Sequence, residues 1–162
     1  MATDFFLDID DLKIKGEATA RHAKDHIDVH SMSFGVTQPH AVGRTGAGLS
    51  TGKASFGEIH FTKYTDKASP KLYMAAGSGT HFGKAVFSGF KHGDKPILYF
   101  KVTLSDVMVT SFQNSGAGGS EMTEQVSFGY SKIEFEYVEQ TKEGGTSGKN
   151  LAMFDVREGA NS

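Results

Sequence analysis

Apolar and polar residues alternate in short runs along this chain. Phe5, Leu7 and Ile9 alternate with aspartates in the first run, and Ile59 and Phe61 mark a similar run further on. A period of two residues is typical of a β-strand that buries one face and wets the other. Twenty glycines, against three prolines, supply turns between these runs. The pattern predicts a mostly β domain.

One segment, residues 69–77, has the pattern of a short helix. Ser69 can cap the first free amides, and Pro70 suits the first helical position. Gly77 or Gly79 can end the helix. The residues on its apolar face are Leu72, Ala75 and Ala76.

The apolar positions change parity in two of the later runs. Val107 and Val109 are out of step with the run that ends at Leu104, which predicts a bend or bulge near Asp106. About eight strands with such bends favour a curled sheet. We therefore expect one domain over residues 1–162, folded as a single closed β-barrel of two curled antiparallel sheets. One short α-helix and long glycine-rich loops, including residues 141–150, complete this expectation.

Composition and charge exclude several classes of protein. The formal net charge is −2, from 17 basic and 19 acidic residues, whereas nucleic-acid-binding proteins usually carry a basic excess. Without cysteine, the chain has no disulfide framework and no thiol nucleophile. It opens without a basic stretch followed by an apolar run, and no segment approaches the ~20 apolar residues of a membrane span. We expect a protein that folds in the cytoplasm and leaves the cell, if at all, without a cleavable signal peptide.

A glycine-rich stretch, residues 42–53, is the one segment that resembles a phosphate-binding loop. Gly52 and Lys53 are followed by Ala54, where a P-loop needs Ser or Thr to bind magnesium. Ala47 stands where the first glycine of that motif would be. We interpret the stretch as a long structural or interface loop, since long loops in compact domains are usually functional.

Histidines and carboxylates offer the other candidates for chemistry. His22, His26 and His30 recur every four residues, but the intervening residues favour a strand, on which His26, Asp28 and His30 would share a face. We expect no metal site there, because no second His/Glu cluster completes a ligand set. Ser, His and Asp occur without a Gly-x-Ser-x-Gly elbow, and the aspartates near position 10 are typical of a solvated strand edge. We therefore expect no enzyme, no catalytic residue and no cofactor.

Several blocks resemble the haemolysin-coregulated protein (Hcp) family. They are DFFLDI at residues 4–9, KGE at 15–17, IDV at 27–29, SFG at 33–35, FTKYTDKASPKL at 61–72 and LSDV at 104–107. The block at residues 61–72 is the most specific of these. The resemblance extends over residues 4–157.

The resemblance implies a structural tube subunit of the bacterial type VI secretion system. Members form homo-hexameric rings that stack into an inner tube, which a contractile sheath expels with a spike at its tip. The implied partners are further copies of the chain, sheath, spike, baseplate and effector proteins carried in the lumen. Neither nucleic acid nor membrane insertion is implied, and the protein reaches the medium or a target cell.

The resemblance also suggests roles for two groups of residues. Candidates for contacts between stacked rings belong to the glycine-rich loop and its flanks: Gln38, His40, Gly43, Arg44, Gly46, Gly48 and Lys53. Candidates for lumen or effector contact are Ser31 and Ser33, which are small and share strand parity.

Three other functions remain as alternatives. A phage-type tail tube protein would share the architecture and the lack of catalysis. A secreted β-barrel metalloenzyme using His26 and His30 would belong to a different class. A small-molecule binding barrel would require an apolar cavity within one subunit.

Overall fold

The computed structural model describes residues 2–11, 14–41, 50–51, 53–143, 145–157 and 160–161. The strands are β1 (Thr3–Ile9), β2 (Ile27–Val29), β3 (Ser31–Ser33), β4 (Val36–Thr37), β5 (His40–Ala41), β6 (Ser50–Thr51), β7 (Ser55–Phe56), β8 (Ile59–Tyr64), β9 (His81–Lys91), β10 (Ile97–Ser115), β11 (Thr123–Gly129), β12 (Lys132–Gln140), β13 (Thr146–Asp155) and β14 (Ala160–Asn161). The helices are α1 (Ser69–Ser78) and a 3-10 turn, η1 (Arg21–Ala23). The predicted mostly β fold with one short α-helix is confirmed.

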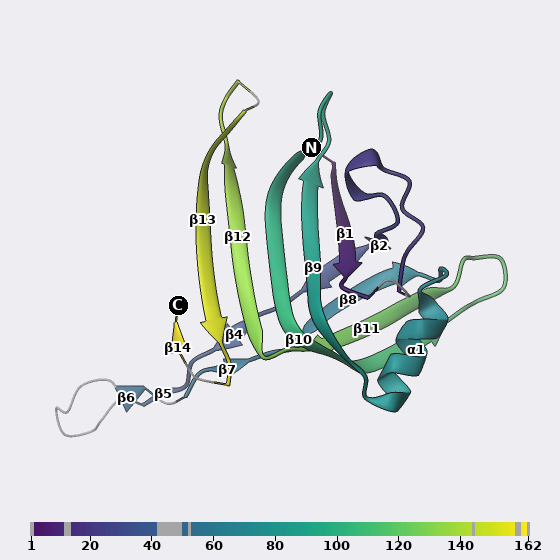
Figure 1. Cartoon of the computed structure of the whole chain (residues 1–162), viewed down its shortest axis with the longest axis horizontal. Helices are drawn as coiled ribbons and strands as arrows, with labels where there is room; N and C mark the ends of the chain where they lie inside the picture. Colours follow the sequence, from purple (N-terminus) through teal and green to yellow (C-terminus); the bar gives the residue numbers. More distant parts are fainter. Residues whose placement is uncertain are drawn as a thin grey trace.

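The strands lie in two layers that share β10. Figure 1 shows β1, β9, β12 and β13 standing beside the first half of β10, while β8 and β11 cross beneath them. Up to Met108, β10 pairs with β9, and from Met108 onward it pairs with β11. Asp106 has a φ of 53° at this point, a value that bends the chain and is uncommon outside glycine. The predicted bend near Asp106 is confirmed.

The predicted closed barrel is not confirmed. Ten strands form one sheet with the path β14-β13-β12-β10-β11-β8-β3, and β9, β1 and β2 branch from β10. The segment that could close the sheet changes partner at His30, whose N–H donates to the carbonyl oxygen of Thr62 at 2.8 Å. Before that residue β2 pairs with β1, and after it β3 pairs with β8. No described strand therefore joins β1 to β8 along its length.

The core lies between the two layers. Its centre is formed by Phe61 of β8, Phe87 of β9 and Phe128 of β11, with ring centroids 5.0 to 6.1 Å apart. Two of the three ring pairs, Phe61 with Phe87 and Phe61 with Phe128, are edge-on, and such contacts add stability beyond the apolar area they bury. Leu72 and Ala75 of α1 are buried against the same cluster, as the helical periodicity predicts. The helix therefore packs against the end of the core.

The ends of α1 match the prediction only in part. Gly79 ends the helix with a φ of 67°, as expected of a glycine cap. The predicted Ser69 cap is wrong, because Ala68 occupies the N-cap position. Ser69 Oγ instead accepts the N–H of Asp66 at 2.9 Å, and Asp66 Oδ1 accepts the N–H of Ala68 at 2.9 Å. These two bonds stabilise the turn that leads into the helix, and neither involves a free amide of its first turn.

Two further expectations need correction. The predicted loop 141–150 is wrong from Thr146 onward, because β13 begins there and pairs with β12. Backbone pairing with β12 stabilises this polar segment although it lacks apolar alternation. Phe6 points away from the main core but is only 4% exposed, because Ala18 and Ala23 cover it. The second face of β1 is therefore not wet along its whole length.

Among the residues that the structure describes, no helix has the length and apolarity needed to span a membrane.

Candidate functional site

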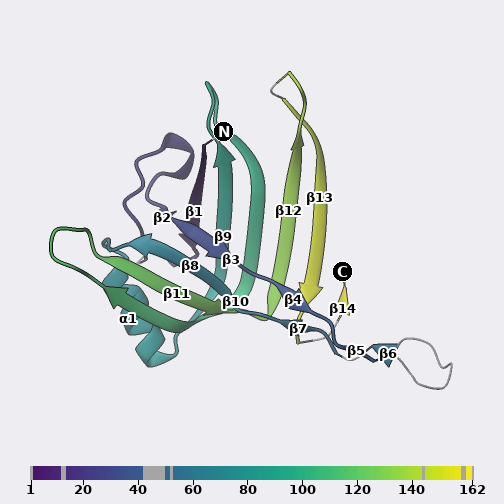
Figure 2. The ribbon, with the colours of Figure 1, turned by 180° about the vertical axis from the view of Figure 1, so that it is seen from behind.

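Ser31 and Ser33 belong to an extended polar surface on the layer formed by β3, β8, β11 and the second half of β10. The register of these strands produces two cross-strand rows. The rows are Ser31, Thr62, Gln125 and Gln113, and Ser33, His60, Ser127 and Ser111. Side chains directly opposite one another in a sheet share a face, so these eight residues form one surface, called the polar face below. Figure 2 shows the four strands side by side from behind.

The polar face is neutral apart from one histidine. Ser31 Oγ and Thr62 Oγ1 are hydrogen bonded at 2.6 Å, and His60 Nδ1 lies 2.7 Å from Ser127 Oγ. All eight residues line a shallow hollow of about 630 Å³, to which Glu58 adds one carboxylate. Short hydroxyls and amides spread over four strands can make many weak hydrogen bonds to a broad partner surface. They do not form the enclosed, convergent constellation that catalysis needs.

Sequence reasoning found only the β3 part of the polar face. His60 and Thr62 alternate with Ile59 and Phe61, so the period of two already places them opposite the core. This signal could have identified them as surface residues of the same strand. Their position beside Ser31 and Ser33, however, depends on which strands pair.

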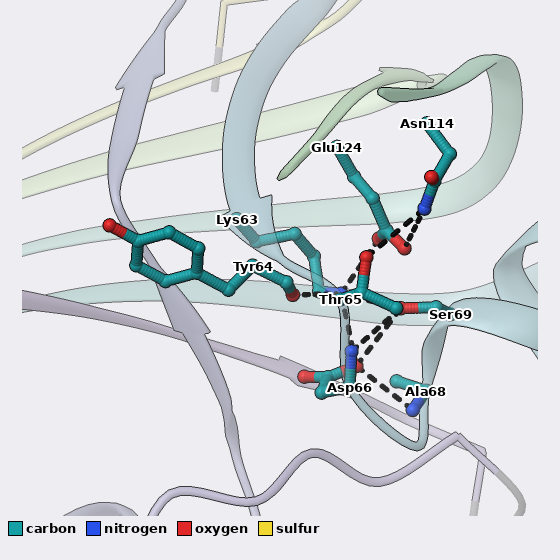
Figure 3. Close-up of polar contacts among 8 residues, drawn as sticks. All are labelled: Lys63, Tyr64, Thr65, Asp66, Ala68, Ser69, Asn114 and Glu124. Atoms are coloured by element: carbon teal, nitrogen blue, oxygen red, sulfur yellow. Dashed lines mark hydrogen bonds and ion pairs between the residues drawn. The ribbon is translucent and has the colours of Figure 1, made fainter. Parts of the chain in front are cut away.

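Behind the polar face lies a buried network of charged and polar side chains (Figure 3). Lys63 and Glu124 have side chains that are 0% exposed, and Lys63 Nζ lies 2.8 Å from Glu124 Oε2. The same ammonium group is 2.9 Å from Asp66 Oδ1 and 2.9 Å from Ser69 Oγ. Asn114 Nδ2 donates to the second oxygen of Glu124 at 3.0 Å. The network thus ties β8, β10, β11 and the start of α1 together behind the polar face.

Three of the residues predicted for ring stacking lie along a two-stranded ribbon that continues from β3 and β8. The ribbon consists of β4 paired with β7 and β5 paired with β6, and Figure 1 shows it projecting from the two layers. Gln38, His40 and Lys53 lie on it, and His40 pairs with Thr51 in the register. The other four candidates, Gly43, Arg44, Gly46 and Gly48, lie outside the described residues.

The histidines that recur every four residues do not converge. The His22 ring packs on Phe90 with a centroid distance of 4.3 Å, and His26 Nε2 lies 3.9 Å from Asp8 Oδ2. His30 is exposed beyond β2. Within the described parts of the chain, no three His, Cys, Asp or Glu side chains are placed to hold a metal ion.

The carboxylates near β1 serve as surface charges. Asp8 Oδ1 forms an ion pair with Lys15 Nζ at 3.3 Å. Burial raises the pKa of Asp28, and the carboxylates of Asp66 and Asp4 raise it further. Asp28 therefore has a raised pKa because of partial burial first and of repulsion by its neighbours second, and this shift does not by itself mark a catalytic group.

Comparisons with known proteins agree on one family. The family described as "Type VI secretion system effector, Hcp" matches residues 6–137. Protein hcp1 of Pseudomonas aeruginosa is 34% identical over 150 residues, which cover 91% of each chain. Hcp1 from Salmonella typhimurium has a crystal structure that superposes with a TM-score of 0.81 at 30% identity, covering both chains completely. A further structure, described as a type six secretion system protein, superposes with a TM-score of 0.93 at 28% identity, over 99% of this chain and 100% of the other.

Proposed function

The chain belongs to the Hcp family of type VI secretion proteins, which is structural and not enzymatic, and from this membership we propose that it forms hexameric rings that stack into the secretion tube. The polar face lines the lumen and contacts effector proteins. Sheath, spike and baseplate are the other partners, and the protein leaves the cell with the tube. The whole-chain likeness to Hcp structures carries this proposal.

Two unpaired strand edges support ring formation. Among the described strands, β3 pairs with β8 alone, and β10 beyond Met108 pairs with β11 alone. Both strands therefore offer unpaired backbone groups, at opposite ends of the layer that carries the polar face. Exposed edges invite pairing with another chain. When the β10 edge of one copy meets the β3 edge of the next, the contact is head-to-tail, and repetition closes a ring.

The ring proposal predicts the mass of the purified protein. Light scattering should give a particle of about six times 17.4 kDa, and negative-stain images should show six-fold rings with a central opening. A particle that remains at 17.4 kDa at high concentration and moderate salt would contradict the proposal.

Enlarging a residue of the polar face should weaken effector retention. Ser33→Gln adds bulk without charge on an exposed position of β3, so rings and melting temperature should stay unchanged while bound effector falls severalfold. Ser147→Gln, on exposed β13, is the matched control and should retain effector normally. The measurement is the amount of a known effector that co-purifies per ring. Equal retention by both variants would place Ser33 outside the effector-binding surface.

The glycine-rich loop should act between rings. Replacing residues 44–51 with a Gly-Ser linker of equal length should change the melting temperature little, because loop identity contributes little to stability when its length is kept. Ring size by light scattering should be unchanged, while tubes and secreted protein should be lost. If the variant is secreted as much as the unmodified protein, the loop does not mediate stacking. Failure to fold would instead assign the loop to the packed body of the domain.

A further inference from the structure

An apolar groove opens beside the β3 edge, on the side away from the polar face. It has a volume of about 300 Å³, and its walls include Phe34, Val36, Phe56, Phe135 and Phe154. Phe56 and Phe154 stack at 4.2 Å, while the Phe34 ring lies 5.5 Å from that of Phe135. Val36 remains 55% exposed and Phe34 37% exposed. Covering a groove with this lining by another apolar surface is favourable, because it removes apolar area from water.

A complementary apolar projection lies beside the β10 edge. Tyr73 and Met74 of α1 are 65% and 66% exposed, the highest values among the large apolar side chains of the described chain. The Tyr73 ring contacts Phe112 of β10 at a centroid distance of 5.8 Å. Because Phe112 pairs with Val126 and packs toward the core, the two α1 residues also lie on the side away from the polar face.

The positions of these surfaces relative to the strand edges determine what covers the groove. Phe34 directly follows β3 and Val36 is the first residue of β4, while Tyr73 and Met74 flank the unpaired part of β10. We infer that Tyr73 and Met74 of each copy enter the Phe34–Val36 groove of the next copy around the ring. This inference rests on the proposed ring, whose edge contact continues directly into the groove. It makes α1 and the groove the side-chain part of a head-to-tail interface.

The groove offers apolar contact rather than hydrogen bonding. Among the described residues that line it, Tyr130 has the one hydroxyl. This group already donates to the carbonyl oxygen of Gly57 at 2.9 Å, and burial raises the pKa of Tyr130. A flexible thioether such as Met74 adapts to an aromatic-lined groove and makes favourable sulfur–ring contacts. A charged side chain in place of Tyr73 or Met74 would lose its water in the groove and find no partner there.

Engineered cysteines test this contact directly, because the chain has none of its own. The variant carrying both Met74→Cys and Val36→Cys, treated with a short bis-maleimide, should give a ladder of covalent multimers up to six subunits on a denaturing gel. Each single variant is the matched control. A head-to-tail contact brings position 74 of one copy only to position 36 of the next, so each single variant should remain at the monomer mass.

The outcomes separate this inference from the proposed ring. Rings that form but do not cross-link in the double variant would overturn the α1–groove contact and leave the ring intact. Covalent dimers from either single variant would show a two-fold contact and would also overturn it. A monomeric unmodified protein would instead overturn the ring. As a second measurement, Met74→Lys should weaken association at least about tenfold, whereas Met122→Lys, on an exposed methionine outside α1, should not.

Discussion

Replacing Lys63 with alanine is expected to lower the free energy of unfolding by about 3–5 kcal/mol. The substitution removes the only ammonium group of the buried network in Figure 3 and leaves Glu124, whose side chain is 0% exposed, without its counter-charge. Asp66 also loses its ion pair at 2.9 Å. An uncompensated buried carboxylate costs more than the pair contributed, because Glu124 keeps only its hydrogen bond from Asn114 and regains neither water nor a counter-charge. Urea unfolding followed by circular dichroism measures the change.

Two variants define the cause of this effect. Lys67→Ala removes the same type of side chain from an exposed position and should change stability by less than about 0.5 kcal/mol. The double substitution of Lys63→Met and Glu124→Leu removes both buried charges and should be less destabilising than Lys63→Ala alone. If Lys63→Ala and Lys67→Ala unfold at the same urea concentration, the buried network does not stabilise the fold.

Gly16→Ala is expected to lower the free energy of unfolding by about 2–3 kcal/mol. A Cβ at position 16 would lie 2.3 Å from the carbonyl oxygen of His26 and 2.5 Å from the Cα of Ile27. Both are backbone atoms, so relief of the clash requires movement of β2 or of the segment that packs over β1. That movement would also strain the hydrogen bond from the N–H of Gly16 to the carbonyl oxygen of Asp25, 2.9 Å long.

Gly77→Ala is the matched control and should have the opposite sign. A Cβ at this exposed position of α1 meets no atom within 4 Å, so alanine only reduces the backbone entropy of the unfolded chain. We expect a gain of about 0.5–1 kcal/mol. Thermal melts of the two variants, run beside the unmodified protein, measure both effects. Equal melting temperatures for Gly16→Ala and the unmodified protein would show that the backbone around position 16 relaxes without cost.

Local patterns were sufficient for several of the main elements and for the family. Alternation around Ile59 and Phe61 predicted β8, and Pro70 with Leu72 and Ala75 predicted α1. The parity change predicted the bend at Asp106. Each of these signals lies within a few residues of the structure it specifies, since strand and helix periods are properties of short segments. The blocks that resemble the Hcp family are equally local.

Pairing between distant strands was decided only by the tertiary structure. In the sequence Lys63 is an ordinary charged residue near the end of a strand, yet it is buried against Glu124, 61 residues away. Ser33 and Ser111 share the polar face only because β8 and β11 lie between them in register. The expected closed barrel was not confirmed for the same reason, because the chain changes its partner strand at His30. A period of two determines which face a side chain occupies, but the partner strand depends on how the whole chain packs.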